Sequence, residues 1–110
     1  MYSQAVKAAG LVFVSGTAPA DPVTGAFAGT TIQEQTRQAL RNVETVLKAA
    51  GSGFDKIVKV TVLLTNPADF AGMNQAYAEF FTTNRPARAV ARLGVEIPKV
   101  LISIEVVALA

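Results

Sequence analysis

Arg88 and Glu105 are the two residues of this chain whose type and setting best suit chemistry. Arg88 follows Pro86-Ala87 in a small apolar stretch, and Glu105 lies within the apolar run Ile102-Ser-Ile-Glu-Val-Val. A guanidinium in that setting either pairs with a structural carboxylate or grips an anionic ligand through two hydrogen bonds. A carboxylate there is half of a buried ion pair, an edge-strand gatekeeper, or a carboxyl group that handles a proton or a water molecule. The residues alone favour a salt bridge for Arg88, and they leave the structural and the chemical interpretations of Glu105 equally open.

Three further residues, Ser15, Gly16 and Asn74, are candidate ligand contacts. Ser15 and Gly16 follow an apolar strand, and glycine allows a ligand to approach the backbone closely. The sequence offers Ser15 no partner that could act as a general base, so nucleophilic catalysis by its hydroxyl is not predicted. Asn74, in the middle of a predicted helix, could bond to a strand or to a ligand. Tyr2 is interpreted as a strand aromatic.

The composition excludes several classes of site. The 110 residues include no His and no Cys, which removes the common metal ligands, thiolate chemistry and the usual general base. Ten basic residues against eight acidic ones are scattered without forming a stripe, so we expect no nucleic-acid partner. No glycine-rich phosphate loop, secretory signal or long apolar segment is found, so we expect a cytoplasmic protein with no membrane contact.

The hydrophobic share of 51% is high beside a charged share of 16%. Globular domains usually contain roughly 25% charged residues. A single domain of this size buries only about two-thirds of its unfolded surface, so part of the apolar surplus should lie in a subunit interface. We therefore expect one domain, residues 1–110, that forms a homo-oligomer.

The elements that must position these residues alternate between strands and helices. We expect strands over 3–9, 11–14, 57–65, 88–93 and 100–109, with a short extra strand at 26–28. Thr31 and Glu34 form a capping box before a helix that ends at Gly51, with Gln35 largely off its apolar face. Asn66-Pro67 begins a second helix that ends near Thr83.

The predicted fold class is α+β, a two-layer ββαβαββ sandwich in which two helices cover one face of a mixed sheet. Alternation along the last strand places Leu101, Ser103, Glu105 and Val107 on one of its faces. No helix remains for the other face of the sheet. That face should therefore pack against further copies of the chain, with the sheets forming an inner barrel.

Seven blocks, taken together, resemble the RidA/YjgF/UK114 family of reactive-intermediate deaminases over essentially the whole chain. They are Tyr2-Ser-Gln-Ala, Val12-Phe-Val-Ser-Gly16, Asp21-Pro-x-Thr-Gly25, Gln35-Thr-Arg-Gln-Ala-Leu-x-Asn42, Asn74-x-x-Tyr77-x-x-Phe80-Phe81, Pro86-Ala-Arg88 and Ile104-Glu105. The resemblance implies a chorismate-mutase-like fold and a homotrimer with ligand clefts between neighbouring subunits. It also implies cofactor-free hydrolysis of short-lived 2-imino and 2-enamino acids, such as 2-aminoacrylate, to 2-oxo acids and ammonia.

When the roles of the family's residues are assigned to the matching positions of this chain, each candidate residue receives a role. Arg88 would bind the substrate carboxylate, and Glu105 would polarise the attacking water or shuttle protons. Tyr2, Ser15, the Gly16 backbone and Asn74 would shape the cleft. The competing hypothesis is a trimer on the same fold that binds small carboxylate metabolites, or acts as a chaperone, without turnover.

The chain also departs from the family pattern. Ala89-Val90 stands where many deaminases have Ser-Cys or Ser-Thr, and Arg92 replaces a common Gln or Glu. Relatives usually carry about a dozen residues before the Tyr-Ser-Gln-Ala block, so we expect this chain to be trimmed. We expect these changes to affect the substrate range.

Overall fold

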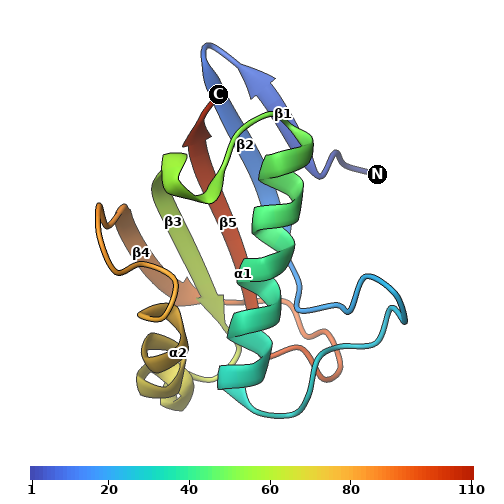
Figure 1. The fold of residues 1–110 in the computed structure, drawn as a ribbon. Coiled ribbons are helices and arrows are strands. Elements are labelled where there is room, and N and C mark those ends of the chain that lie inside the picture. The colour runs from blue at the N-terminus through green and yellow to red at the C-terminus, as the bar shows by residue number, and fades with distance from the viewer.

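The computed structural model, which describes residues 1–110, contains one five-stranded mixed sheet with two helices packed on one of its faces (Figure 1). The strands lie in the order β1-β2-β5-β3-β4, so β1 and β4 form the two edges. Only β3 and β4 are parallel; the other neighbours are antiparallel. The strands are β1 (Ala5–Ala8), β2 (Leu11–Thr17), β3 (Ile57–Leu64), β4 (Ala87–Arg92) and β5 (Ile102–Leu109). The predicted fold class is confirmed.

Helix α1 (Ile32–Ala49) begins at the predicted capping box. The Thr31 hydroxyl accepts a hydrogen bond from the Glu34 backbone N–H, and the Glu34 carboxylate accepts one from the Thr31 N–H. Its apolar face, Ile32, Ala39, Leu40, Val43 and Leu47, is buried against the sheet, as the spacing predicts. Hydrogen bonds within the capping box lower the pKa of Glu34. Neither helix is long and apolar enough to cross a membrane.

The prediction that Gln35 lies off the buried face of α1 is wrong, because this residue is only 1% exposed. Its amide nitrogen donates to the Lys99 carbonyl at 2.7 Å, and its amide oxygen accepts from the Leu101 N–H at 2.8 Å. A buried amide is stable when both its donor and acceptor are satisfied in this way. Gln35 thereby fastens the segment before β5 to α1. Periodicity alone could not reveal a polar residue used as an internal tie.

Two other predicted elements differ from the structure. Helix α2 (Phe70–Tyr77) follows a 3-10 turn at Pro67–Asp69 and ends before the predicted Thr83. The chain tightens there because the Glu79 and Phe80 N–H groups bond three residues back. Phe80 then packs near Phe54, with ring centroids 5.8 Å apart, instead of extending the helical face. The predicted strand at 26–28 is a single bridge between Ala20 and Phe27.

Helix α2 is held in place by the capped turn that precedes it and by an ion pair at the residue Glu79 that follows it. The Asn66 side chain accepts from the Ala68 N–H at 2.9 Å, which confirms the predicted helix start. Arg37 on α1 contacts both carboxylate oxygens of Glu79, at 3.0 and 2.8 Å. This pairing lowers the pKa of Glu79 and joins α1 to the segment that follows α2. The helix that carries Asn74 and Tyr77 is thus oriented from both ends.

The hydroxyl of Thr36 is the one buried side-chain polar atom without a hydrogen-bond partner in the chain. Because an unpaired buried hydroxyl is unfavourable and valine has the same shape, Thr36→Val should raise the free energy of unfolding by about 1 kcal/mol. Urea denaturation at fixed protein concentration would measure this. Thr45→Val on the same helix is the control, since the Thr45 hydroxyl is exposed and donates to the Arg41 carbonyl. A gain from both variants, or from neither, would contradict the prediction.

The face of the sheet opposite the helices is open in the single chain. The β5 residues that point to the helices are buried, namely Ile102, Ile104, Val106 and Ala108, while Glu105 and Leu109 are exposed. Val6, Phe13 and Leu109 are 52%, 43% and 50% exposed on this uncovered side. One layer of helices therefore leaves an apolar sheet surface in contact with solvent.

Candidate functional site

Arg88 lies near the start of the edge strand β4 and turns toward α2. Its Nη1 donates to the Asn74 side-chain oxygen at 2.7 Å, and its Cζ lies 4.7 Å from the centroid of the Tyr77 ring. The Phe70 ring centroid is 6.0 Å away on the same side. These contacts orient the guanidinium through a hydrogen bond and cation–π attraction. Most of its five N–H donors remain available for an anionic ligand.

The spacing of α2 explains why these partners meet. Met73, Asn74 and Tyr77 follow Phe70 by three, four and seven residues, so the four side chains lie along adjoining faces of one short helix. Met73 and Tyr77 are buried, and Asn74 stands at the margin of that face, within reach of β4. Burial raises the pKa of Tyr77, and the Arg88 charge opposes this effect. The phenol is therefore neutral around pH 7 and serves as a platform for the guanidinium.

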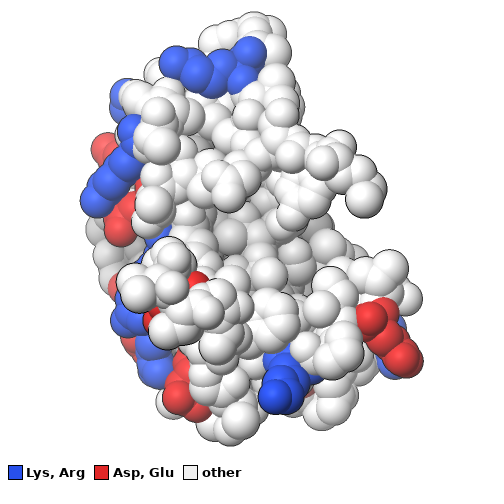
Figure 2. Space-filling view, turned by 90° about the vertical axis from the view of Figure 1, so that its right-hand side faces the viewer, with Lys and Arg blue, Asp and Glu red and all other residues white.

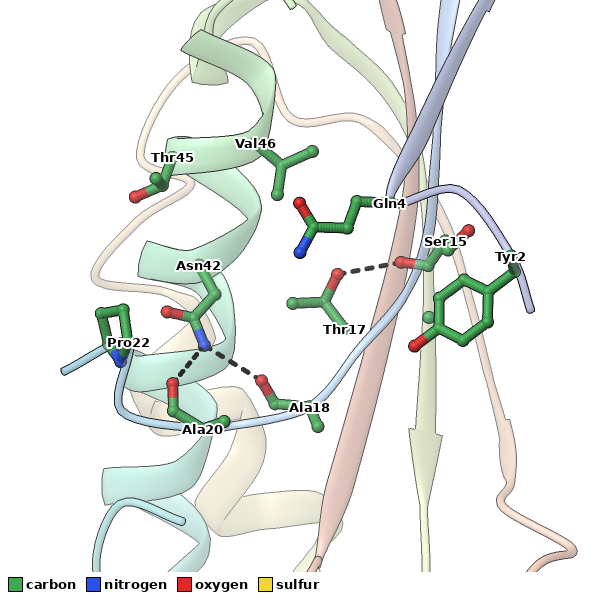
Figure 3. A pocket seen from close by; sticks show the side chains of 11 residues that line it. Tyr2, Gln4, Ser15, Thr17, Ala18, Ala20, Pro22, Asn42, Thr45 and Val46 are labelled. Carbon is green, nitrogen blue, oxygen red and sulfur yellow. Dashed lines mark hydrogen bonds between the residues drawn. The ribbon is translucent and has the colours of Figure 1, made fainter. Parts of the chain in front are cut away.

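A second group of candidates lies near the other edge of the sheet. Tyr2, Ser15 and Gly16 line a cavity of about 360 Å³ between the N-terminal segment, β2 and α1 (Figure 3). The face that contains this cavity is hollowed at its centre, and no charged side chain lies there (Figure 2). The other lining residues are Gln4, Thr17, Ala18, Ala20, Pro22, Asn42, Thr45 and Val46. The cavity thus offers neutral hydrogen-bonding groups.

Irregular pairing shapes this cavity. The register of β2 against β5 shifts between Val14 and Thr17, so Ser15 and Gly16 form a bulge. The Ser15 hydroxyl donates to the Ser3 carbonyl at 2.6 Å and holds the N-terminal segment beside β2. A Cβ added to Gly16 would lie 3.0 Å from the Ser103 hydroxyl, which leaves little room for a side chain. The bulge therefore presents backbone, as a ligand-facing strand end requires.

Asn42 closes the floor of the cavity from α1. Its amide nitrogen donates to the Ala18 and Ala20 carbonyls at 3.1 and 2.7 Å, which fixes the loop after β2 (Figure 3). Gln4, Thr17 and Asn42 were not predicted as site residues. Gln4 and Asn42 lie in two of the blocks that carry the family resemblance, which was the only available signal. No rule of spacing places Thr17 at a cavity.

Arg88 and Glu105 do not form an ion pair, so the predicted structural salt bridge is wrong. The sheet register pairs Arg88 with Val60, whose side chain is buried under the helices, but pairs Glu105 with Thr61 on the open face. The two side chains therefore leave the sheet on opposite sides. The salt bridges in the chain are Arg37–Glu79 and Lys48–Glu44. Both Arg88 and Glu105 are exposed, free to meet a ligand or another subunit.

The candidates form two separate groups within one chain. Arg88 and Asn74 lie at the β4 edge, whereas Tyr2, Ser15 and Gly16 lie near the β1–β2 edge, and β5 and β3 intervene. Strands spaced by about 4.8 Å put β2 and β4 roughly 14 Å apart. Glu105 stands on β5 opposite the bulge, on the open face. No metal site is found, since no three acidic side chains come together and the chain has no His or Cys.

Comparison with known proteins identifies close relatives. The family model described as Endoribonuclease L-PSP matches residues 1–110. A RutC family protein of Pyrococcus horikoshii is 45% identical over 97% of this chain and 85% of its own length. The human 2-iminobutanoate/2-iminopropanoate deaminase is 42% identical over 80% of this chain and 64% of its own.

A solved structure agrees with the sequence relatives. The structure of Escherichia coli TdcF with bound serine aligns to this chain with a TM-score of 0.91 and 34% sequence identity. The alignment covers 100% of this chain and 88% of the TdcF chain. The whole-chain match to the family model and this similarity of fold point to the same family as the sequence blocks do. The chain belongs to the RidA/YjgF family.

Proposed function

We propose that this chain is a homotrimeric deaminase that hydrolyses 2-imino and 2-enamino acids, of the 2-aminoacrylate, 2-iminopropanoate and 2-iminobutanoate type, to 2-oxo acids and ammonia. The observation that carries the proposal is the division of the candidate residues between opposite edges of one sheet. An interface between two different surfaces of the same chain closes into a ring when the rotation allows. A ring of three would bring the β4 edge of one subunit to the β1–β2 edge of the next and join the two groups in a cleft.

The relatives support the chemistry. The human relative is named for deamination of 2-iminobutanoate and 2-iminopropanoate, and the E. coli TdcF structure holds serine, which carries an α-carboxylate. Arg88, already oriented by Asn74 and Tyr77, would receive that carboxylate through a bidentate contact. The uncharged cavity beside Gly16, supplied by the neighbouring subunit, would adjoin the imine group of the ligand.

The reaction needs few groups. Water adds to the carbon of the protonated imine, a proton moves from that oxygen to the nitrogen, and the C–N bond breaks to release ammonia and the 2-oxo acid. Because the protonated imine is already electrophilic, the protein need only orient it and place one water molecule. In this proposal Arg88 fixes the orientation, Glu105 accepts the proton from water, and no cofactor takes part.

The test of the function is a competition assay. An amino-acid oxidase generates the imine from alanine or 2-aminobutanoate, and semicarbazide traps what the protein does not hydrolyse. The purified protein should accelerate 2-oxo acid release and lower the trapped fraction. A protein that binds pyruvate without changing either quantity would be the non-catalytic carboxylate binder.

Glu105→Gln should lower kcat by about 100-fold, because general-base catalysis contributes roughly 10²–10⁴-fold and glutamine cannot accept the proton. Binding of pyruvate, measured by calorimetry, should be unchanged because Arg88 is intact. Glu96→Gln removes a carboxylate from the exposed loop between β4 and β5 and serves as the control. An unchanged kcat for Glu105→Gln would refute the role of Glu105 as the general base. Ser103, which lies on the same face of β5 as Glu105 and adjoins Gly16, would then be the next candidate.

A further inference from the structure

Arg92 ends β4 on the same face as Arg88. Alternate residues of a strand share a face, and the register pairs Arg88, Val90 and Arg92 with Val60, Val62 and Leu64. Unlike Arg88, Arg92 makes no side-chain hydrogen bond and no salt bridge in the chain, and it is exposed. The edge strand therefore carries two guanidinium groups in line, and the second has no internal partner.

An apolar cavity lies beside Arg92, and one of its lining residues, Phe70, also lies near the Arg88 guanidinium. Its volume is about 310 Å³, and it is lined by Leu64, Pro67, Phe70, Val90, Ala91 and Arg92. Arg92 supplies the only charged group of this lining. Phe70 connects the cavity to the first guanidinium, because its ring centroid lies 6.0 Å from the Arg88 Cζ. A ligand held by Arg88 could thus lay a short carbon chain along Phe70 and Val90 toward Arg92.

The spacing of the two arginines suits a small dicarboxylate. Four residues of strand span about 13 Å, and side chains stand roughly perpendicular to the sheet, so the two groups leave β4 in parallel. A hydrogen bond of about 3 Å at each end leaves roughly 7 Å between the outer oxygens of the ligand. A four- or five-carbon chain with a carboxylate at each end fills that length. A monocarboxylate would leave Arg92 unused.

We propose that the substrates include dicarboxylic 2-imino acids of four or five carbons, with Arg88 binding the C1 carboxylate and Arg92 the distal one across this cavity. The inference rests on the proposed function and narrows its substrate class. The chemistry is unchanged: water adds to the imine carbon, the C–N bond breaks and ammonia leaves, without an oxidant or reductant. Arg92 is then a specificity residue that acts through the distal carboxylate.

The experiment compares two imines in the same competition assay. 2-Iminoglutarate is generated by a glutamate oxidase, and 2-iminobutanoate by an oxidase acting on 2-aminobutanoate. Arg92→Ala should lower kcat/KM for 2-iminoglutarate by about 10- to 100-fold, because a charge-assisted hydrogen bond is lost. Its kcat/KM for 2-iminobutanoate should change less than threefold. Arg92→Lys should recover part of the lost activity, and Arg41→Ala, which removes an exposed charge from α1, should affect neither substrate.

Binding separates this inference from the proposed function. Calorimetry with 2-oxoglutarate and 2-oxobutanoate tests recognition even if neither imine is turned over. Weaker binding of 2-oxoglutarate alone in Arg92→Ala would support the dicarboxylate site without any activity. The inference is overturned if the wild-type protein hydrolyses 2-iminobutanoate but not 2-iminoglutarate. It is also overturned if Arg92→Ala changes both ligands equally, or leaves 2-oxoglutarate binding unchanged.

Discussion

Arg88→Ala is expected to reduce kcat/KM for imine hydrolysis by 100-fold or more, to the level of the uncatalysed reaction. The guanidinium is the one basic group oriented by both a hydrogen bond and an aromatic ring, to Asn74 and Tyr77. Without this guanidinium, nothing binds the substrate carboxylate and holds the imine in line with the attacking water. Because the site has so few polar groups, orientation of the substrate is its main contribution to the rate enhancement. The competition assay with 2-iminopropanoate measures the effect.

Controls separate catalysis from folding in this variant. Arg85→Ala removes another exposed arginine three residues upstream, whose Nε donates to the Phe81 carbonyl at 3.3 Å, and should retain activity. Arg88→Lys keeps the charge but loses the planar fork, so its activity should fall between those of wild type and Arg88→Ala. Circular dichroism and molar mass should match wild type for all three. A fully active Arg88→Ala protein would rule out the proposed anchor.

Val107→Asp is expected to convert the proposed trimer into monomers and to abolish activity, with Arg88 and Asn74 still in place. Val107 lies on the open face of β5, paired with Phe13 of β2, where the sheet exposes apolar side chains. A carboxylate buried unpaired in an interface costs several kcal/mol, enough to dissociate subunits at micromolar concentration. Light scattering coupled to size-exclusion chromatography gives the molar mass, and the same fractions are assayed for imine hydrolysis.

The matched control for this variant is Val23→Asp. Val23 is 92% exposed in the loop after β2, so the same chemical change there should leave the assembly intact. If Val107→Asp remained trimeric and active, the open face would not be the interface. If the wild-type protein were an active monomer, a site completed by a neighbouring subunit would be refuted.

Local patterns predicted most of the fold because they reflect local interactions. The capping box at Thr31 and Glu34 and the Asn66 cap satisfy backbone groups within three residues, so their sequence signature is sufficient. The alternation of β5 likewise predicted which side chains share a face, and the structure buries the set that alternates with Glu105. The end of α2 was predicted near Thr83, beyond its actual end at Tyr77, because aromatic packing near Phe54 overrides helical periodicity. Gln35 was misplaced because its two partners lie more than 60 residues away.

The amino-acid sequence defines which groups are available for chemistry, since a chain without His or Cys leaves arginines, lysines, carboxylates and neutral polar side chains. How these groups are arranged follows only from the tertiary structure. Arg88 and Glu105 are on neighbouring strands in the sequence, yet β3 lies between those strands in the sheet, and the register turns the two side chains to opposite faces. Shifting the register of either strand by one residue would reverse its face. Strand pairing is a long-range choice made by the packed core, so whether two charged groups meet can be learned only from the folded chain.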